Sequence, residues 1–457
     1  MTQVDLTIKN GTIVAPNSSF QAGIAVKEGK IVAIASNANL PDSSRTIDAA
    51  GLFVLPGVID VHVHLRDPGY TYKEDFKTGT LAAAAGGTTC VFDMPNNHPP
   101  VKDVTALKDK IRAAEEKAVV DYGLYGLLTD GNLDEVKKLA QAGVIGYKCF
   151  MGETLGKIGP PSDGEMLDEL AEVAAVDLRV SVHAENDPIL QYRINKLRKQ
   201  GRRDAYAHFE SRPQIVEEEA VNRAIAYERE TKCKLHLAHL SSVQGVDAVR
   251  KARQRRQPIT AETEPHYLLL NDKDYEKIGS LMKVNPAVKT EIDRASLWNA
   301  INDGTIDMIA TDHAPQTLEE KTKPIIFDCM SGFPGLETSV PLMLTQVKKG
   351  LLSLSKYVQL TSENPAKAWG IYPQKGCIAI GSDADFTIID PTMKGKIEPA
   401  KFLSKAKWSP FENFQFEGAP VYTVVRGNVA MDHGSVDGTV KGKMIRPIVD
   451  SQKTESN

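Results

Sequence analysis

The chain has 457 residues, of which 42% are hydrophobic and 25% are charged, and these proportions are ordinary for a soluble globular protein. Its 55 lysine and arginine residues against 59 aspartate and glutamate residues give a net charge of −4, and no basic stretch is long enough to track a phosphate backbone, so we expect no nucleic-acid partner. Five scattered cysteines without a CxxC pair suggest neither a disulfide framework nor a cysteine-based zinc site.

The N-terminal sequence and the apolar runs indicate the cellular compartment. The N-terminal sequence MTQVDLTIKNGTIV has no basic region that leads into an apolar one. No uninterrupted apolar run approaches the about 18 residues that suggest a transmembrane helix. We therefore expect a cytoplasmic protein with reduced thiols and no membrane partner.

The first 55 residues have the pattern of a small β-rich module. Short alternating strands are predicted at residues 6–9, 12–14, 24–27 and 31–35. The turn dipeptides Asn10-Gly11 and Glu28-Gly29 separate neighbouring strands in this series.

Residues 56–374 have a different texture, in which short apolar runs alternate with helical patterns. The runs fall at residues 57–63, 89–94, 144–150, 179–183, 235–240 and 308–311, and the helices between them include residues 103–117, 134–142, 216–228 and 243–254. Repeated strand and helix units imply parallel strands, and their number suits a closed barrel better than an open sheet. The predicted fold is therefore α/β, with a (β/α)8 barrel of the TIM type.

The C-terminal part returns to short strands, at residues 385–389, 421–425 and 429–431. Two β-rich ends around a different middle predict one β-sandwich domain formed by both termini, residues 1–55 plus 375–449. Residues 450–457 are polar and without periodicity, and we expect them to form a flexible tail.

The first candidate site residues, His62 and His64, follow the first apolar run of the predicted barrel. Residues two apart on a strand point to the same face, so both rings can reach one ion, and neutral imidazole is a preferred ligand for zinc and similar metals. The alternative is a pair of structural histidines at the mouth of a strand.

Two further predicted strands each end in a histidine, His183 and His239. A parallel barrel gathers its active site at the carboxyl ends of its strands. Four strand-end histidines out of only ten in the chain favour a shared metal site. His236 lies three residues before His239, on the opposite face, and is expected to pack or to orient a ligand.

Asp312 follows the last apolar run and supplies a carboxylate. Such a group can coordinate a metal and also exchange a proton with a metal-bound water. The alternative is a helix N-cap, and both roles could coexist.

Lys148 lies within an apolar strand, where a lysine is rarely buried without a partner because desolvating its ammonium is expensive. A snorkelling or ion-paired side chain is one interpretation. The other is a lysine that has taken up carbon dioxide. The resulting carbamate could bridge two metals about 3.5–4 Å apart.

Taken together, these residues resemble the cyclic amidohydrolase branch of the amidohydrolase superfamily, which includes hydantoinase or dihydropyrimidinase, dihydroorotase and allantoinase. The resemblance covers nearly the whole chain, through GLFVLPGVIDVHVHLRDPG, MPNNHPP, GYKCF, HAEN, LHLAHLSS, KVNPAV, ATDHAP and GSDADFTIID. It implies hydrolysis of a ring amide in a small cyclic ureide, with hydantoinase as the leading activity and dihydroorotase, then allantoinase, as alternatives. It also implies a homotetramer or homodimer. A non-enzymatic scaffold relative is disfavoured because no ligand is missing.

Carried over residue by residue, the resemblance implies a centre of two divalent ions, zinc by preference. His62, His64 and Asp312 would bind the more buried ion, and His183 and His239 would bind the other. An N6-carboxylysine at Lys148 would bridge them. The ions would polarise the ring carbonyl and deprotonate a water, and Asp312 would pass that proton to the leaving nitrogen.

The resemblance also suggests four substrate-binding residues. Arg66 and Asn96 match dihydroorotase, where the corresponding pair grips the substrate carboxylate. Arg66 could instead form a salt bridge with Asp67 or Glu74.

Two further positions, Gln316 and Asn285, do not decide which substituent the substrate ring carries. Gln316, four residues after the metal Asp, replaces the dihydroorotase histidine and would hold an anion less strongly. Asn285 falls where the family binds the ureide through main-chain groups.

Three further residues, Glu185, Asn186 and His266, are expected to orient metal ligands by hydrogen bonding from behind. Residues 317–323 are polar and follow the Asp312 strand. They could form a lid over the ring or an ordinary surface loop.

Overall fold

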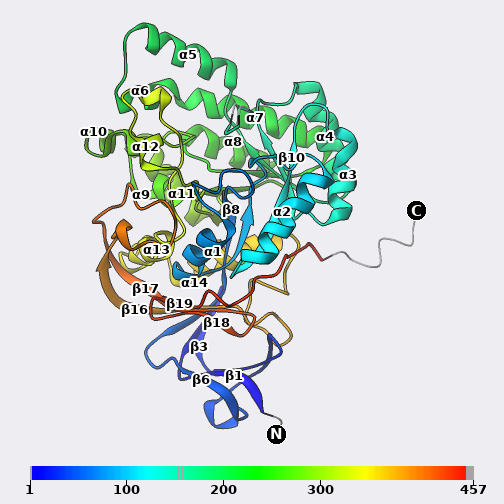
Figure 1. The fold of residues 1–457 in the computed structure, drawn as a ribbon, viewed down its shortest axis with the longest axis vertical. Helices are drawn as coiled ribbons and strands as arrows, with labels where there is room; N and C mark the ends of the chain where they lie inside the picture. The colour runs from blue at the N-terminus through cyan, green and yellow to red at the C-terminus, as the bar shows by residue number, and fades with distance from the viewer. Residues whose placement is uncertain (1–2, 153, 157, 449–457) are drawn as a thin grey trace.

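A computed structural model describes residues 3–152, 154–156 and 158–448, and it shows a helix-covered barrel joined to a smaller sandwich of sheets (Figure 1). The N-terminal strands and the C-terminal strands lie together at the same end of the molecule. The expected tail, residues 450–457, lies outside the described residues.

Within the described residues, eight parallel strands form the barrel in chain order: β8 Val58–Val63, β9 Thr88–Asp93, β10 Asp121–Leu128, β11 Gly146–Phe150, β12 Arg179–His183, β13 Lys234–Leu237, β14 Thr260–Thr263 and β15 Met308–Ile309. A parallel bridge between Val63 and His313 brings the last strand region against the first. The predicted barrel is confirmed. Strands β10 and β14 fall outside the runs named from the sequence, because glycines interrupt β10 and threonines and a glutamate interrupt β14.

The helices of the described residues are α1 Phe76–Ala85, α2 Val104–Lys117, α3 Leu133–Ala142, α4 Asp163–Ala175, α5 Asp187–Lys199, α6 Ala205–Ser211, α7 Gln214–Thr231, α8 Val243–Gln254, α9 Pro265–Leu269, α10 Tyr275–Ile278, α11 Glu291–Asp303, α12 Leu318–Lys321, α13 Ser339–Lys348, α14 Leu354–Val358 and α15 Asn364–Ala368. Many begin at a capping side chain, as Asp103 does for α2 and Ser242 for α8, which satisfies a free backbone N–H. The helices surround strands whose residues are buried on both faces, as in β8, β9 and β10.

Two sheets form the second unit. One has the order β5-β4-β1-β6 and the other β19-β18-β17-β16-β7-β2-β3. Their strands are β1 Val4–Lys9, β2 Thr12–Ala15, β3 Ser18–Gln21, β4 Gly23–Lys27, β5 Lys30–Ala35, β6 Ser43–Asp48, β7 Phe53–Pro56, β16 Phe386–Lys396, β17 Gln415–Val425, β18 Asn428–Asp432 and β19 Ser435–Val436.

The sandwich draws on both termini, as predicted. Strand β7 pairs antiparallel with β16 from the C-terminal part. Leu6 and Val26 of one sheet share a buried core with Val54, Phe386 and Val424 of the other. The division of the chain at residues 55 and 375 stays a prediction.

A buried charge cluster joins the sandwich to the barrel. Lys375 Nζ lies 2.6 Å from Asp121 on β10 and 3.2 Å from Asp383, and it also pairs with Asp385. Arg426 pairs with Asp121 from the other side. Because an ammonium already lies among these three carboxylates, the cluster is an ion-paired joint between the two units.

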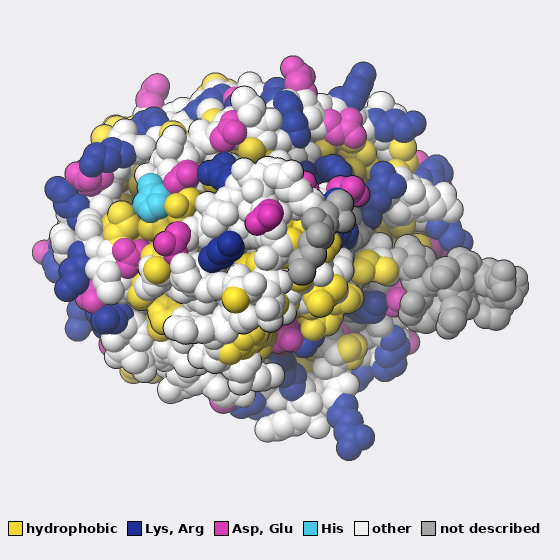
Figure 2. Space-filling view, turned by 90° about the horizontal axis from the view of Figure 1, so that it is seen from below, with side chains coloured by type: hydrophobic (Ala, Val, Ile, Leu, Met, Phe, Trp, Pro, Cys, Tyr) yellow, Lys and Arg dark blue, Asp and Glu magenta, His cyan; other side chains and the backbone are white. Residues whose placement is uncertain are grey.

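The surface mixes both signs of charge. On the face seen in Figure 2, Lys and Arg side chains alternate with Asp and Glu, and hydrophobic groups lie between them. Over the described ranges, none of the helices is both long and apolar enough to cross a membrane.

Candidate metal centre

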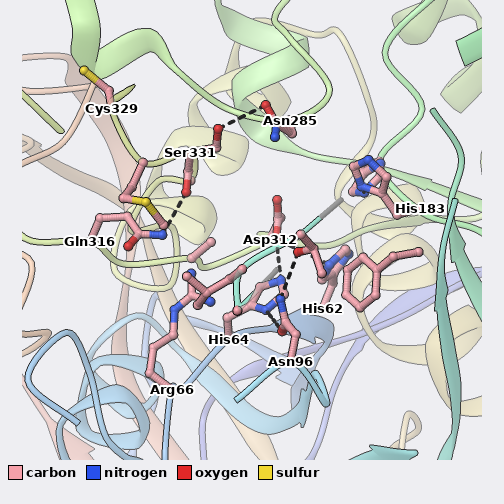
Figure 3. Close-up of a pocket in the computed structure, with 18 residues that line it drawn as sticks. His62, His64, Arg66, Asn96, His183, Asn285, Asp312, Gln316, Cys329 and Ser331 are labelled. Atoms are coloured by element: carbon pink, nitrogen blue, oxygen red, sulfur yellow. Dashed lines mark hydrogen bonds and ion pairs between the residues drawn. The ribbon is translucent and has the colours of Figure 1, made fainter. Parts of the chain in front are cut away.

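The carboxyl ends of β8 and β15 bring three expected metal ligands together. Asp312 Oδ1 lies 3.1 Å from His64 Nε2 and 3.3 Å from His62 Nε2, and all three side chains are buried. Their ligand atoms lie within 4.8 Å of one another, which is close enough to share one cation (Figure 3). Helix α12, which follows, is capped by Thr317, so Asp312 is not its N-cap.

The electrostatics of Asp312 favour its ionised form. Burial by itself would raise the pKa of this carboxyl. The neighbouring His62 and His64 rings outweigh that effect and hold the pKa below its ordinary value. A carboxylate in this state is the form that can coordinate a cation or accept a proton.

His183 and His239 form a second group at the ends of β12 and β13. His183 Nδ1 lies 2.8 Å from His239 Nε2, and the His239 ring centroid lies 5.5 Å from that of His62. Burial lowers the pKa of both His183 and His239 and so favours neutral rings, which are the form that binds metals. The second group therefore adjoins the first.

Lys148, on β11, is fully buried, and its Nζ has no hydrogen-bond partner within the described part of the chain. Burial lowers its pKa to about 8, although Glu262 and Asp312 oppose this. Asp312 belongs to the first group, and the same ammonium contributes to the lowered pKa of His183 and of His239 in the second, so Lys148 lies within electrostatic reach of both groups. The Lys148 ammonium therefore does not reach solvent, and it forms no ion pair among the described residues.

Two buried carboxylates that the sequence analysis did not name support the ligands from behind. Glu262 Oε1 lies 2.5 Å from His62 Nδ1, and its other oxygen lies 3.0 Å from His236 Nε2. Asp60 accepts a 2.6 Å hydrogen bond from Thr311 Oγ1 and a 3.1 Å bond from the His62 N–H. A carboxylate inside an otherwise apolar or β-branched strand is the signal that could have identified both.

The three expected orienting residues differ in what they contact. Glu185 lies 3.0 Å from His183 Nε2 and pairs with the buried Arg212, so it supports that ligand. Asn186 instead caps helix α5, because its side-chain oxygen faces the N–H groups of the first turn, and its amide donates to Glu219. The His266 ring packs on Tyr267 and Phe333, and its Nε2 has no partner among described atoms.

Three residues of the site adopt left-handed backbone angles: φ is 42° at His239, 43° at Asp312 and 63° at Arg66. A non-glycine residue in this region costs about 1–3 kcal/mol and persists only where the surrounding structure holds it. That three such residues face one cavity marks these strand ends as a functional site.

The cavity above the ligands has a volume of about 320 Å³, and Arg66 lines it. This side chain is only 4% exposed, its Nε has no hydrogen-bond partner, and no ion pair of Arg66 occurs in the described ranges. The two expected alternatives are not formed, since Asp67 pairs with Lys117 at 2.8 Å and Glu74 accepts from Ser404. The guanidinium is therefore available to an acceptor in the cavity.

The other expected substrate residues also reach this cavity. Asn96 Oδ1 lies 2.7 Å from His64 Nδ1, so Asn96 also orients an expected metal ligand. Gln316 Nε2 donates a 2.9 Å bond to the Ser331 carbonyl, and Asn285 Oδ1 accepts a 3.0 Å bond from Ser331 Oγ (Figure 3). Ser331 thus ties Gln316 to Asn285 across one wall.

Residues 317–323 directly follow Gln316, but none of them lines the cavity. Lys321, on α12, is fully buried and donates a 2.6 Å bond to the main-chain oxygen of Lys283. Glu320 lies 3.0 Å from the ammonium of Lys73. The segment is held in place at two points and is not a loose surface loop.

The donor set fits divalent cations. Four imidazoles and a carboxylate are the ligand types that zinc and similar metals accept. Two buried nitrogens, Lys148 Nζ and His239 Nδ1, have no hydrogen-bond partner among the described residues. Buried polar atoms normally have a partner, so these two agree with a site that binds metal ions.

A barrel with these strand-end ligands defines the amidohydrolase class. The model of the Amidohydrolase family matches residues 53–430, and the chain belongs to this family. It is 38% identical over 437 residues to the L-hydantoinase of Paenarthrobacter aurescens, covering 94% of this chain and 95% of that relative. It is also 38% identical over 441 residues to a dihydroorotase of Methanosarcina mazei, covering 95% of each. The solved structure of L-hydantoinase (dihydropyrimidinase) from Arthrobacter aurescens matches with a TM-score of 0.94 at 37% identity, covering 97% of this chain and 100% of that chain.

Proposed function

We propose that this protein is a metal-dependent cyclic amidohydrolase that hydrolyses the ring amide C–N bond of a cyclic ureide, with hydantoinase, or dihydropyrimidinase-like, activity as the leading assignment. One observation carries the proposal: two adjoining groups of expected ligands, buried or nearly so, lie at the base of a cavity sized for a small ring, with the unpartnered Lys148 within reach of both. The similarity to an L-hydantoinase in sequence and structure supports the choice of substrate class.

Each group of ligands would hold one divalent ion. His62, His64 and Asp312 would hold the first and His183 with His239 the second, and Lys148, as N6-carboxylysine, would bridge them. Two ions in such a site supply Lewis acidity for the ring carbonyl and lower the pKa of a coordinated water. We propose zinc, because imidazole and carboxylate ligands suit it well.

The protein's own residues would manage the proton. Asp312 accepts a proton from the attacking water as the water oxygen bonds to the carbonyl carbon. The ring C–N bond then breaks, and Asp312 returns the proton to the leaving nitrogen. Asn96 and Glu262 hold the His64 and His62 rings from behind, which keeps both ligands aimed at the same point.

Two expectations beyond the chemistry remain proposals. The first is a homo-oligomer, a tetramer or a dimer, which rests on the resemblance to the family. The second is a cytoplasmic location, which rests on the free cysteines found in the described residues, most of them buried. Sedimentation velocity of the purified chain measures the first directly.

Dihydroorotase is the second candidate function, and Arg66 favours it. A nearly buried guanidinium without an ion pair, inside the cavity, suits a substrate carboxylate. Gln316 adds an amide donor without charge, so the anion would depend mainly on Arg66. Allantoinase is the third candidate.

The deciding experiment is a substrate panel with metal-loaded protein: hydantoin, 5-substituted hydantoins, dihydrouracil, dihydroorotate and allantoin. We expect the highest kcat/KM with hydantoins, and Arg66→Ala should keep most of that activity. If dihydroorotate dominates and Arg66→Ala abolishes its turnover, the protein is a dihydroorotase. Absence of turnover on every ring would instead support a non-enzymatic scaffold.

A further inference from the structure

Glu264 is a buried carboxylate that none of the roles described above accounts for. It directly follows β14, its side chain is 0% exposed, and neither of its oxygens has a hydrogen-bond partner among the described residues. Removing a carboxylate from water without a partner is among the most expensive events in folding. A group of this kind calls for a partner that the chain alone does not supply.

The position of Glu264 points to the metal centre. A carboxylate oxygen of Glu264 lies within 4.8 Å of ligand atoms of His62 and Glu262. Glu262 and Glu264 are two residues apart at the end of one strand, so both side chains project to the same side, into the barrel. Glu264 does not line the substrate cavity, so it approaches the centre from the barrel interior.

The neighbouring protein groups do not serve as its partner. Glu264 is the residue before helix α9, but its side chain accepts no capping hydrogen bond. His62 is already engaged at Nδ1 by Glu262 and at Nε2 by Asp312. Lys148 Nζ forms no ion pair in the part of the chain that the structure describes.

The charges of the site lead to the same conclusion. Glu262, Glu264 and Asp312 are three buried carboxylates, and the charges of all three act on the Lys148 ammonium. Carboxylation of Lys148, as proposed above, would replace that positive charge with a negative one. Divalent cations bound at the proposed centre would then balance the carboxylates.

We propose that Glu264 is a further carboxylate of the metal centre, which balances the charge of the more buried ion from inside the barrel and strengthens its binding without touching the substrate. This inference rests on the proposed metal centre. Glu264 is a positioning residue and not a catalytic one, because it lies beside His62 and Glu262 and does not line the cavity.

The test compares Glu264→Gln and Glu264→Met with wild type by zinc binding rather than by turnover. Each full-length protein is stripped with a chelator, titrated with zinc alone, and analysed for bound ions and affinity. We expect zinc affinity to fall roughly 10- to 100-fold in both variants, as for other groups that support metal ligands. Metal-free variants should melt at or above the wild-type temperature, because no hydrogen bond is lost.

A matched control is Glu169→Gln. Glu169, on α4, is equally buried and also has one oxygen without a partner, but it accepts a hydrogen bond from the Thr129 N–H and does not line the cavity. It should retain wild-type zinc affinity.

The outcomes separate the two proposals. Wild-type zinc affinity in both Glu264 variants would overturn the role of Glu264 and leave the metal centre intact. Metal-free variants that melt well below wild type, with unchanged affinity, would show a purely structural role and also overturn it. A wild-type chain that binds no divalent ion would overturn the metal centre itself.

Discussion

Lys73 Nζ donates a 2.6 Å hydrogen bond to Gln316 Oε1, and this contact decides which end of the amide faces which neighbour. A lysine ammonium only donates and the Ser331 carbonyl only accepts, so the Gln316 oxygen must lie toward Lys73 and its nitrogen toward Ser331. Trp408 Nε1 holds the Gln316 main chain with a further 2.9 Å bond. The remaining N–H of the amide is therefore the group available to a substrate.

Replacing Lys73 by Met should loosen this arrangement, because Met keeps the volume but cannot donate. We expect KM to rise roughly 2- to 10-fold, the worth of one hydrogen bond of about 0.5–1.5 kcal/mol, with kcat within about twofold of wild type. Steady-state kinetics on the best substrate measure both. Lys77→Met is the control, since Lys77 donates to the Gly438 carbonyl away from the cavity. An unchanged KM in Lys73→Met would contradict this role.

Replacing Lys148 by Met should remove the bridge between the two groups of ligands. Elemental analysis should then find fewer than two ions per chain, and turnover should fall at least about 100-fold, since losses of this size follow the removal of ligand support. Circular dichroism checks that the barrel persists. Lys251→Met, at an exposed position on α8, should keep both ions and full activity. Full metal content in Lys148→Met would refute the bridge.

Replacing Thr311 by Val should disturb the contact between the first and last barrel strands. Val keeps the shape but removes the hydroxyl that donates 2.6 Å to Asp60 and accepts from the His313 N–H. We expect a loss of about 1–3 kcal/mol in stability, the cost of leaving a buried polar group without its partner. Because Thr311 precedes Asp312, kcat should also fall. Urea unfolding and kinetics test the two effects, and an unaltered melting curve would show that this contact is dispensable.

Lys283 predicts a pH dependence of stability. This buried ammonium donates 2.8 Å and 2.6 Å bonds to the Ile326 and Cys329 carbonyls, without a carboxylate. Burial lowers its pKa from 10.5 to about 7. Between these two values the unfolded chain holds a proton that the folded protein lacks, so stability due to Lys283 rises with pH across this window.

The matching experiment compares wild type with Lys283→Met at pH 7 and pH 9. Removing the titrating group should flatten the rise by up to about 2 kcal/mol, since each pH unit contributes at most about 1.4 kcal/mol per proton. Urea denaturation at the two pH values gives the difference directly. Parallel pH profiles for the two proteins would mean that Lys283 titrates normally in the fold.

Much of the fold follows from local sequence pattern. The runs at residues 57–63 and 179–183 predict strands because their apolar, β-branched side chains suit a sheet buried on both faces. The helices α2 and α8 lie close to their predicted bounds, since their periodicity is local. The long hairpin of β16 and β17 extends beyond its apolar runs, because its outer half is polar and its pairing is set by the neighbouring strand.

The sequence by itself determined where the candidate ligands lie, since His62, His64, His183, His239 and Asp312 each fall at or just after the end of a strand pattern that local periodicity predicts. Only the tertiary structure decided which side chains hydrogen-bond to the site residues and hold them in place. Glu262 meets His62 across 200 positions, Asp60 meets Thr311 across 251, and Lys73 meets Gln316 across 243. These contacts depend on how the barrel closes and how its loops pack, and no periodicity within a strand or a helix encodes a partner so distant in the chain.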